Sequence, residues 1–191
     1  MEISQEAIVR AAIDILNRDG LEKLSMRALA ASLGVKAPAL YWHIKNKQDL
    51  IDQIAEKISA EMLTSCGLGD AKKFLFEFAH VYRQKLLEVR DGVAVLVASY
   101  PSTAARCESI KNVMISLLHI GVKEKYCLIA AGMYNNYVLS FVADEIIYKA
   151  NPDGMPAFIT TILGTGYEKM SFNEQFERGL HVLFAGFKTL E

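Results

Sequence analysis

The feature that most constrains the fold of this 191-residue chain is the segment 24–47, which places helix-starting, helix-ending and turn residues at close spacing. Ser25 precedes an apolar run and can cap a helix, because its hydroxyl accepts from the free N–H groups of the first turn. Gly34 follows that run and adopts at little cost the left-handed conformation that ends a helix. Pro38 then stands in the first turn of a second helix, where its missing N–H costs nothing. Two short helices joined by a glycine turn form a helix-turn-helix, the unit that places a helix in the major groove of DNA.

Positive charge is concentrated in the same part of the chain. From Lys23 to Gln48 there are five Lys or Arg residues and one His but no Asp or Glu, whereas the whole chain has a formal net charge of −1. Lys and Arg side chains that neutralise phosphates supply the sequence-independent part of DNA affinity. A solvated helical face is the alternative interpretation of such a charge run. The capping, turn and aromatic residues agree with the charge and favour DNA binding.

The segment resembles the DNA-binding domain of the TetR family of bacterial repressors. The resemblance is carried by Leu-Gly-Val at 33–35 and by Pro-Ala-Leu-Tyr-Trp-His-Ile-Lys-Asn-Lys at 38–47, a pattern specific for the tetracycline-repressor branch of that family. It extends more weakly to Arg-Asp-Gly at 90–92, to Pro101 and to the pattern at 138–145. The resemblance implies an N-terminal DNA-binding domain and a larger helical domain that binds a small molecule and dimerises.

Helical periodicity continues through the rest of the chain, and strand signals are almost absent. We therefore predict an all-α fold, in which Ser102 caps a helix that ends at Gly121. Two glycines and a capping Asp at 66–70 form the clearest break in the sequence and predict a domain boundary. Residues 1–65 are expected to form a three-helix helix-turn-helix DNA-binding domain. Residues 66–191 are expected to form a larger helical ligand-binding and dimerisation domain.

The resemblance assigns DNA contacts to side chains in and around the second helix of the pair. Arg27 is expected to contact a base or a phosphate. Ala37 and Ala39 can offer only methyl contacts, for example to a thymine methyl group, whereas the tetracycline repressors carry polar base-reading residues there. We therefore expect a different operator sequence. The full predicted DNA-binding set is Ser25, Arg27, Lys36, Ala37, Pro38, Ala39, Tyr41, His43 and Lys47. Trp42 is expected to pack in the small core of the domain.

The resemblance also implies a ligand pocket in the second domain. In the drug-binding members a drug–magnesium complex is held by two His, an Asn and a Phe, and the matching positions here are Leu96, Leu63, Phe78 and Tyr82. Because no imidazole remains for a chelate, we expect neither tetracycline nor magnesium here, and no metal or cofactor. Apolar walls with few polar groups suit a largely hydrophobic or aromatic ligand. The predicted lining residues are Leu63, Phe78, Tyr82, Leu96, Ser99, Asn112, Val113, Asn136, Tyr137, Phe141 and Asp144. A packed core without a cavity is the alternative.

No catalytic residues can be named from the sequence. Phosphate-binding glycine loops are not found, and the remaining histidines, His80, His119 and His181, are scattered over different predicted helices. We expect a homodimeric repressor that a small hydrophobic molecule releases from a palindromic operator on double-stranded DNA. A co-repressed regulator or an activator is the closest alternative. A sequestering or carrier protein with the same fold is a further alternative, which the retained basic segment disfavours.

The last two long helices are expected to form the dimer interface. Apolar residues recur along the last of them, at Phe176, Leu180, Leu183, Phe184 and Phe187. Leu180 and Phe184, near the centre of this stripe, are the residues that we expect to contact the partner subunit. No apolar run reaches the length of a bilayer and no signal peptide begins the chain, so we expect a cytoplasmic protein without a membrane partner. The three cysteines lack metal-ligand spacing and are expected to be reduced thiols.

Overall fold

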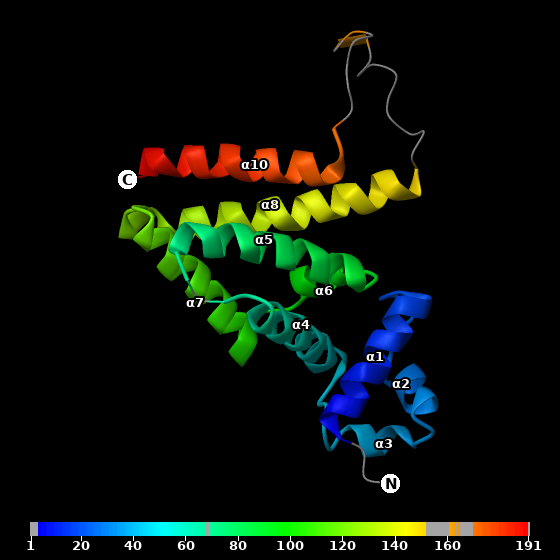
Figure 1. Cartoon of the computed structure of the whole chain (residues 1–191). Helices are drawn as coiled ribbons and strands as arrows, with labels where there is room; N and C mark the ends of the chain where they lie inside the picture. The colour runs from blue at the N-terminus through cyan, green and yellow to red at the C-terminus, as the bar shows by residue number, and fades with distance from the viewer. Residues whose placement is uncertain (1–3, 68, 152–160, 163, 165–169, 191) are drawn as a thin grey trace. The chain divides into compact units, whose positions relative to one another are not determined.

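A computed structural model describes residues 4–67, 69–151, 161–162, 164 and 170–190, and within these residues the regular structure is entirely helical (Figure 1). The predicted all-α class is confirmed. The chain divides into two compact units, Met1–Ser116 and Leu117–Glu191. This division by compactness is separate from the functional boundary expected after residue 65, which stays a prediction.

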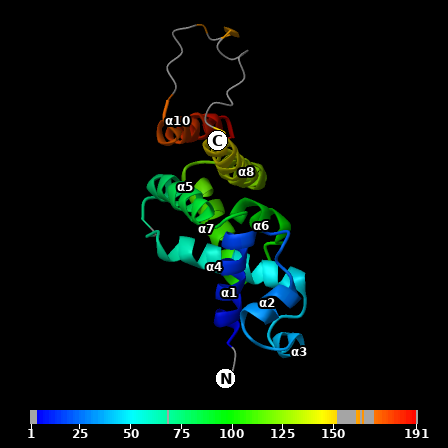
Figure 2. The same ribbon diagram turned by 90° about the vertical axis from the view of Figure 1, so that its right-hand side faces the viewer.

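The first unit begins with three helices, α1 (Gln5–Asp19), α2 (Met26–Ser32) and α3 (Ala37–Leu40), which Figure 2 shows close to the N-terminus. The local signals act as the sequence predicts. The Ser25 hydroxyl accepts from the N–H of Ala28 at 3.1 Å and caps α2. Gly34 has a φ of 66°, and the N–H groups of residues 34 and 35 donate to the carbonyls of residues 31 and 30. These paired bonds end the helix in a Schellman motif.

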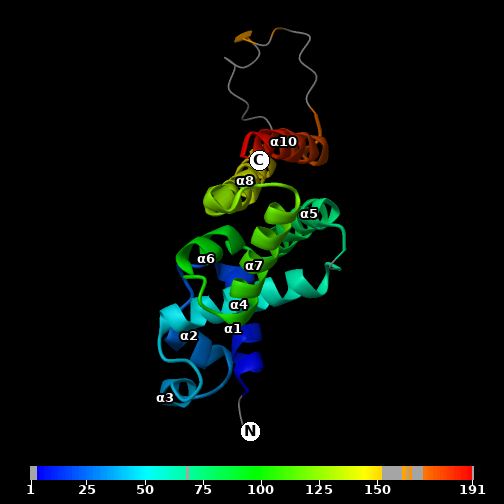
Figure 3. The same cartoon turned by 90° about the vertical axis from the view of Figure 1, so that its left-hand side faces the viewer.

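Helices α4 (Lys47–Thr64), α5 (Ala71–Glu88), α6 (Gly92–Ala98) and α7 (Ala104–His119) follow (Figure 3). Asn46 caps α4 through the N–H of Asp49 at 2.9 Å, and Asp70 caps α5 through the N–H of Lys73 at 2.8 Å. Helix α4 packs against α1, α5 and α6, so it joins the N-terminal helices to the rest of the unit.

The start of α7 differs from the prediction that Ser102 caps it. The carboxylate of Glu56, on α4, accepts from the N–H of Ala105 at 2.9 Å and from the N–H of Arg106 at 3.3 Å. A carboxylate at this end of a helix also interacts favourably with the helix dipole. The cap therefore comes from a residue 49 positions away, which the local sequence pattern does not reveal.

The second unit is built on α8 (Glu124–Ala150) and α10 (Phe172–Phe187), followed by a short 3-10 helix, Lys188–Leu190. Ser171 and Glu174 form a capping box at the start of α10. The two helices run antiparallel, as ring pairs show: Tyr134 packs on Phe184 near one end, and Tyr148 packs on Phe172 near the other. An aromatic interior thus holds α8 and α10 together.

The close approach of α8 and α10 requires a glycine. The Tyr137 hydroxyl donates to the Phe176 carbonyl at 2.8 Å, and its ring stacks on the Phe176 ring. A Cβ at Gly179 would overlap that hydroxyl. The tyrosine and the glycine therefore form one interlocked contact between the helices.

The expectation that Leu180 and Phe184 contact a partner subunit is wrong. Leu180 is 0 % exposed within its own chain, and Phe184 is buried beside Tyr134. The aromatic stripe of α10 is buried against α8 of the same subunit, so these side chains are not available to a partner subunit. Val182 is a large apolar residue of α10 that instead faces outward, at 72 % exposure.

Candidate functional site

The predicted DNA-binding side chains divide into those that shape the helix-turn-helix and those that face solvent. The Ser25 hydroxyl is used in its cap, and Pro38 stands in the first turn of α3. Ala37 and Ala39 are half-buried. The charged and aromatic members of the set are all exposed, namely Arg27, Lys36, Tyr41, His43 and Lys47.

The cations of this surface are available for a partner. Within the described part of the chain, Arg27, Lys36, Lys45 and Lys47 form no ion pair with an acidic side chain. Lys47 is also the first residue of α4, so its position depends on that helix. Unpaired, exposed cations on a helix-turn-helix are the groups that neutralise DNA phosphates.

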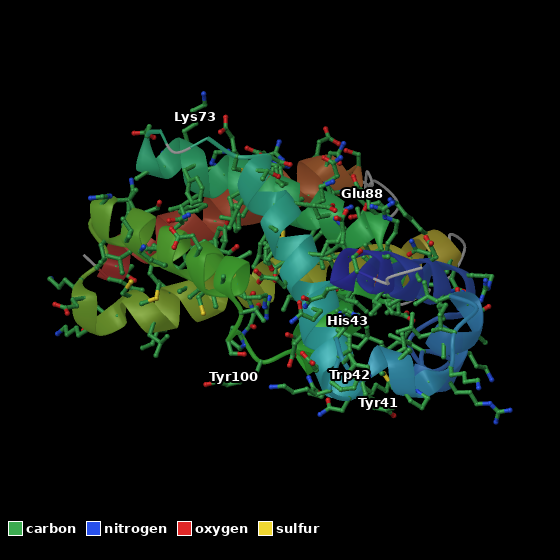
Figure 4. The ribbon with its side chains drawn as sticks, turned by 90° about the horizontal axis from the view of Figure 1, so that it is seen from below. Tyr41, Trp42, His43, Lys73, Glu88 and Tyr100 are labelled. Atoms are coloured by element: carbon green, nitrogen blue, oxygen red, sulfur yellow. The ribbon has the colours of Figure 1, made fainter. Side chains whose placement is uncertain are left out.

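Trp42 does not pack in the core as expected. Its side chain is 89 % exposed, and that of Tyr41 is 53 % exposed; Figure 4 shows both at the turn that follows α3. Leu40 and Ile44 are fully buried on either side of them. Because residues four apart share a face in such a tight turn, the core takes residues 40 and 44 and directs residue 42 outward. The spacing of those two apolar residues is the signal that could have revealed it.

Seven predicted ligand-binding residues lie in the first unit. Phe78 and Tyr82 are buried on α5, where Phe78 lies between Phe74 and Tyr82 in a run of ring contacts. Leu96 and Ser99 are buried on and just after α6. The remaining three are Leu63 on α4, half-buried, and Asn112 and Val113 on α7, respectively half-buried and buried.

One polar residue among these side chains was missed by the sequence interpretation. Arg106, in the first turn of α7, donates from Nη2 to the Leu96 carbonyl at 3.3 Å. Burial raises the pKa of the Tyr82 phenol to about 12, while the charge of Arg106 beside it acts in the opposite direction. The missed signal was a basic residue in the first turn of a helix, where an acidic residue is the favourable one.

The other four predicted ligand-binding residues, Asn136, Tyr137, Phe141 and Asp144, belong to α8 in the second unit. Tyr137 and Phe141 pack with Phe176 in the interior between α8 and α10. Asn136 and Asp144 are exposed. Whether any of the four contacts a ligand stays a prediction.

No cluster of three or more His, Cys, Asp or Glu residues in the described part of the chain is arranged to hold a metal ion. None of the helices described has both the length and the apolar character needed to cross a membrane.

Comparison with known proteins agrees with this geometry. Residues 8–54 match the model of bacterial regulatory proteins of the tetR family. The class A tetracycline repressor of transposon 1721 from Escherichia coli is 40% identical over 103 residues, which are 52% of this chain and 48% of that protein. The match therefore spans about half the length of that relative.

Solved structures extend the likeness to the whole chain. TetR from Acinetobacter baumannii AYE is 30% identical, covers 98% of both chains and has a TM-score of 0.75; a variant of it in complex with minocycline is 28% identical over 98% of both chains, with a TM-score of 0.77. BioQ with its double-stranded DNA operator is 27% identical over 97% of this chain and 98% of that one, with a TM-score of 0.76.

The helix-turn-helix, the helical second part and these relatives together define a DNA-binding transcriptional regulator. The chain belongs to the TetR family of bacterial regulatory proteins. Membership of a family of regulators agrees with the prediction that the protein is not an enzyme.

Proposed function

We propose that this protein is a homodimeric repressor, which binds a palindromic operator and releases it when a small, largely hydrophobic molecule binds among α4, α5, α6 and α7. The observation that carries the proposal is the surface formed by α3 and the start of α4, where exposed aromatic side chains stand among unpaired cations. We expect this regulator to act on bacterial DNA in the cytoplasm.

The DNA contacts follow from the position of each side chain on that surface. Lys36 stands at the N-cap of α3, so the first turn of this helix would enter the major groove. Ala37 and Ala39 would contact base edges through methyl groups. Tyr41, His43 and Lys47 would contact phosphates on either side. The solved complex of BioQ with its operator supports this use of the fold.

The dimer would form through the outer faces of α8 and α10. On α8, Leu128, Ile129 and Met133 are exposed apolar residues, and on α10 Val182 is another. Exposed apolar side chains grouped on two adjacent helices are typical of a partner interface. Two helices from each subunit would make a four-helix interface, whose two-fold symmetry matches that of a palindromic operator.

Helix α4 is the element through which a ligand would change DNA binding. Its first residue, Lys47, belongs to the DNA surface, and its Gln48 donates to the Ala98 carbonyl at the end of α6 at 2.9 Å. Further along, Glu56 caps α7. A ligand that packs differently against α6 and α7 in two conformations would shift α4 between them, by no more than its difference in affinity for the two.

The chemistry of the ligand differs from that of a tetracycline. The complex of the Acinetobacter relative with minocycline supports small-molecule binding by this fold. In the present chain Leu96 and Phe78 are buried apolar residues at the positions where the resemblance places a chelate-holding His and a drug-holding Asn. We therefore expect tetracycline with magnesium to leave DNA binding unchanged.

The test is binding of the full-length protein to the promoter DNA of its own and neighbouring genes, followed by fluorescence anisotropy at several salt concentrations. Lys47→Ala is expected to weaken binding to every bound sequence and to lower the salt dependence by about one unit of slope. Lys73→Ala is the matched control, since Lys73 is an exposed lysine of α5 that lies far from Trp42 in Figure 4.

Three outcomes separate the alternatives. No binding to any promoter fragment would contradict the repressor and favour the sequestering protein. A ligand that strengthens binding would indicate a co-repressed regulator. Equal affinities for Lys47→Ala, Lys73→Ala and the wild type would show that the proposed DNA surface is wrong.

A further inference from the structure

The start of α7 holds two polar atoms that the fold leaves unsatisfied. Among the residues that the structure describes, Thr103 Oγ1 and Arg106 Nε are shielded from solvent and have no hydrogen-bond partner. The two residues are three positions apart in one turn, since the N–H of Cys107 donates to the Thr103 carbonyl, and they therefore share a face. Folded proteins satisfy the large majority of their buried polar groups, so a neighbouring pair of exceptions calls for an explanation.

The surroundings of Arg106 do not neutralise its charge. Its Nη2 donates to the Leu96 carbonyl at 3.3 Å, which is a long bond to an uncharged acceptor. Its guanidinium also lies beside the buried Tyr82 phenol. No described carboxylate forms an ion pair with this half-buried side chain. A guanidinium stays charged at any pH the protein meets, so its burial without an anion is unfavourable.

The carboxylate that contacts this helix turn is already used. Both oxygens of Glu56 accept from the N–H of Ala105, and one also accepts from the N–H of Arg106. This carboxylate caps the backbone of α7. The guanidinium is thus left with an unsatisfied donor, although an acid stands at the same helix end.

The geometry of a guanidinium indicates what its partner would be. Nε–H and one Nη–H point in parallel along one edge of the planar group, and this edge matches the two oxygens of a carboxylate. In Arg106 this partner would satisfy Nε and replace or share the long bond from Nη2. Tyr82 and Leu96, which flank the guanidinium, are buried, as is the neighbouring Phe78.

We propose that the effector of this regulator is a hydrophobic carboxylic acid, whose carboxylate binds Arg106 and the Thr103 hydroxyl while its apolar part packs near Phe78, Tyr82 and Leu96. This inference rests on the proposed function and gives the chemical class of the ligand. Arg106 is not among the positions that the resemblance to tetracycline repressors makes ligand contacts.

The experiment compares acids with their uncharged counterparts on the full-length protein. Octanoic, decanoic and 1-naphthaleneacetic acids are each paired with the primary amide, and sodium sulfate serves as the free anion. Thermal unfolding and calorimetric titration measure binding to the wild type, Arg106→Met, Arg106→Lys and the control Lys111→Met, which removes an exposed cation from the same helix. A ligand that binds the folded state raises the melting temperature with concentration.

The expected result is an acid that stabilises the wild type and Lys111→Met clearly more than its amide does. Arg106→Met should bind that acid roughly 30-fold or more weakly, because a buried carboxylate would lose its charged partner. Arg106→Lys, which keeps the charge without the planar fork, should fall between them. Without ligand, Arg106→Met should melt at or above the wild-type temperature, since the unsatisfied donor has been removed.

Several results would overturn the proposal. They are equal stabilisation by acids and amides, equal binding of the acid to wild type and Arg106→Met, stabilisation by sulfate as large as that by the acids, or no stabilisation by any acid of the series. If Arg106→Met is too unstable to measure, Arg106→Gln repeats the test, and destabilisation of both variants without ligand would assign Arg106 a structural role.

Failure of this inference is distinguishable from failure of the proposed function. If an amide releases the protein from promoter DNA, the proposed repressor function holds, but its effector is an uncharged molecule and not an acid. A protein that binds no promoter DNA would contradict the repressor, whatever its affinity for acids.

Discussion

Aromatic side chains serve opposite purposes at the two ends of this chain. On α10, Phe176, Phe184 and Phe187 are buried within their own subunit. Phe176 stacks on Tyr137 of α8, and Phe184 and Phe187 pack edge to face on each other. At the turn after α3, Tyr41 and Trp42 are exposed. An aromatic residue that lies on the apolar face of a helix, as Phe176 does on α10, is buried in the core. An aromatic residue that lies between two buried apolar residues, as Trp42 does between Leu40 and Ile44, stays exposed.

The largest expected effect separates the two faces of α10. Leu180→Glu should destabilise the fold by more than about 4 kcal/mol, since it removes a buried apolar side chain and places a carboxylate in an apolar interior. Val182→Glu should leave the fold of the single subunit intact, because its side chain is exposed within its own chain. Chemical denaturation followed by circular dichroism measures both.

The same pair of variants tests the dimer. Light scattering should give the mass of a folded monomer for Val182→Glu and the mass of a dimer for the wild type. A folded dimer of Val182→Glu would show that this face of α10 is not the interface. A stable, folded Leu180→Glu protein would contradict the packing of α10 on α8.

The next largest effect concerns Trp42, in the exposed turn after α3. Trp42→Ala should lower promoter affinity roughly 30-fold, because truncation of an anchoring Trp in an interface costs about 2 kcal/mol or more. Its free energy of unfolding should stay within about 0.5 kcal/mol of the wild-type value. Anisotropy and denaturation measure the two quantities. Tyr100→Ala, which removes another exposed aromatic residue outside the helix-turn-helix, should leave affinity unchanged.

If Trp42→Ala instead kept the wild-type promoter affinity and lost stability, Trp42 would belong to the core. In that case Trp42→Ala would cost about 3–5 kcal/mol of stability, as deletion of a buried Trp does.

The smallest expected effect is on the pH dependence of stability and concerns Tyr82, which is buried, in contrast to the exposed Tyr41. Burial raises the pKa of Tyr82 to about 12 from an ordinary 10. The unfolded chain therefore loses this proton first as the pH rises, and stability that is fully present below pH 10 is lost between pH 10 and 12. The loss should be on the order of 1–2 kcal/mol by pH 12. Denaturation from pH 9 to 12 should show a steeper fall for the wild type than for Tyr82→Phe, and parallel curves would contradict the burial of the phenol.

Much of the fold follows from short-range patterns in the sequence. Ser25 and Asp70 each cap the helix expected of them, and Gly34 adopts the expected left-handed conformation. Asn46 and Ser171 cap α4 and α10 in the same local way. Each of these interactions closes within three or four residues. The residues that carry it are therefore visible together in the sequence, and so is the helix-turn-helix that they build.

The candidate site was predictable to a lesser extent. The cations of the proposed DNA surface are exposed, as the sequence predicts, because a charged side chain that has no partner stays in water. Trp42 was assigned to the core because it is apolar, and its exposure depends on Leu40 and Ile44 filling that core first. Arg106 was overlooked, because its position beside Tyr82 and Leu96 follows from how α7 contacts α5 and α6, which lie far from it in the sequence.

The amino-acid sequence by itself determined the helices, their ends, the concentration of positive charge and the family to which the chain belongs. The tertiary structure alone decided that Leu180 faces inward, that Trp42 faces outward and that Glu56 caps a helix 49 residues away. The physical reason is the range of the interactions. A cap or a turn is satisfied by its own neighbours, whereas the choice of a buried face or a distant cap depends on which other helix packs against it.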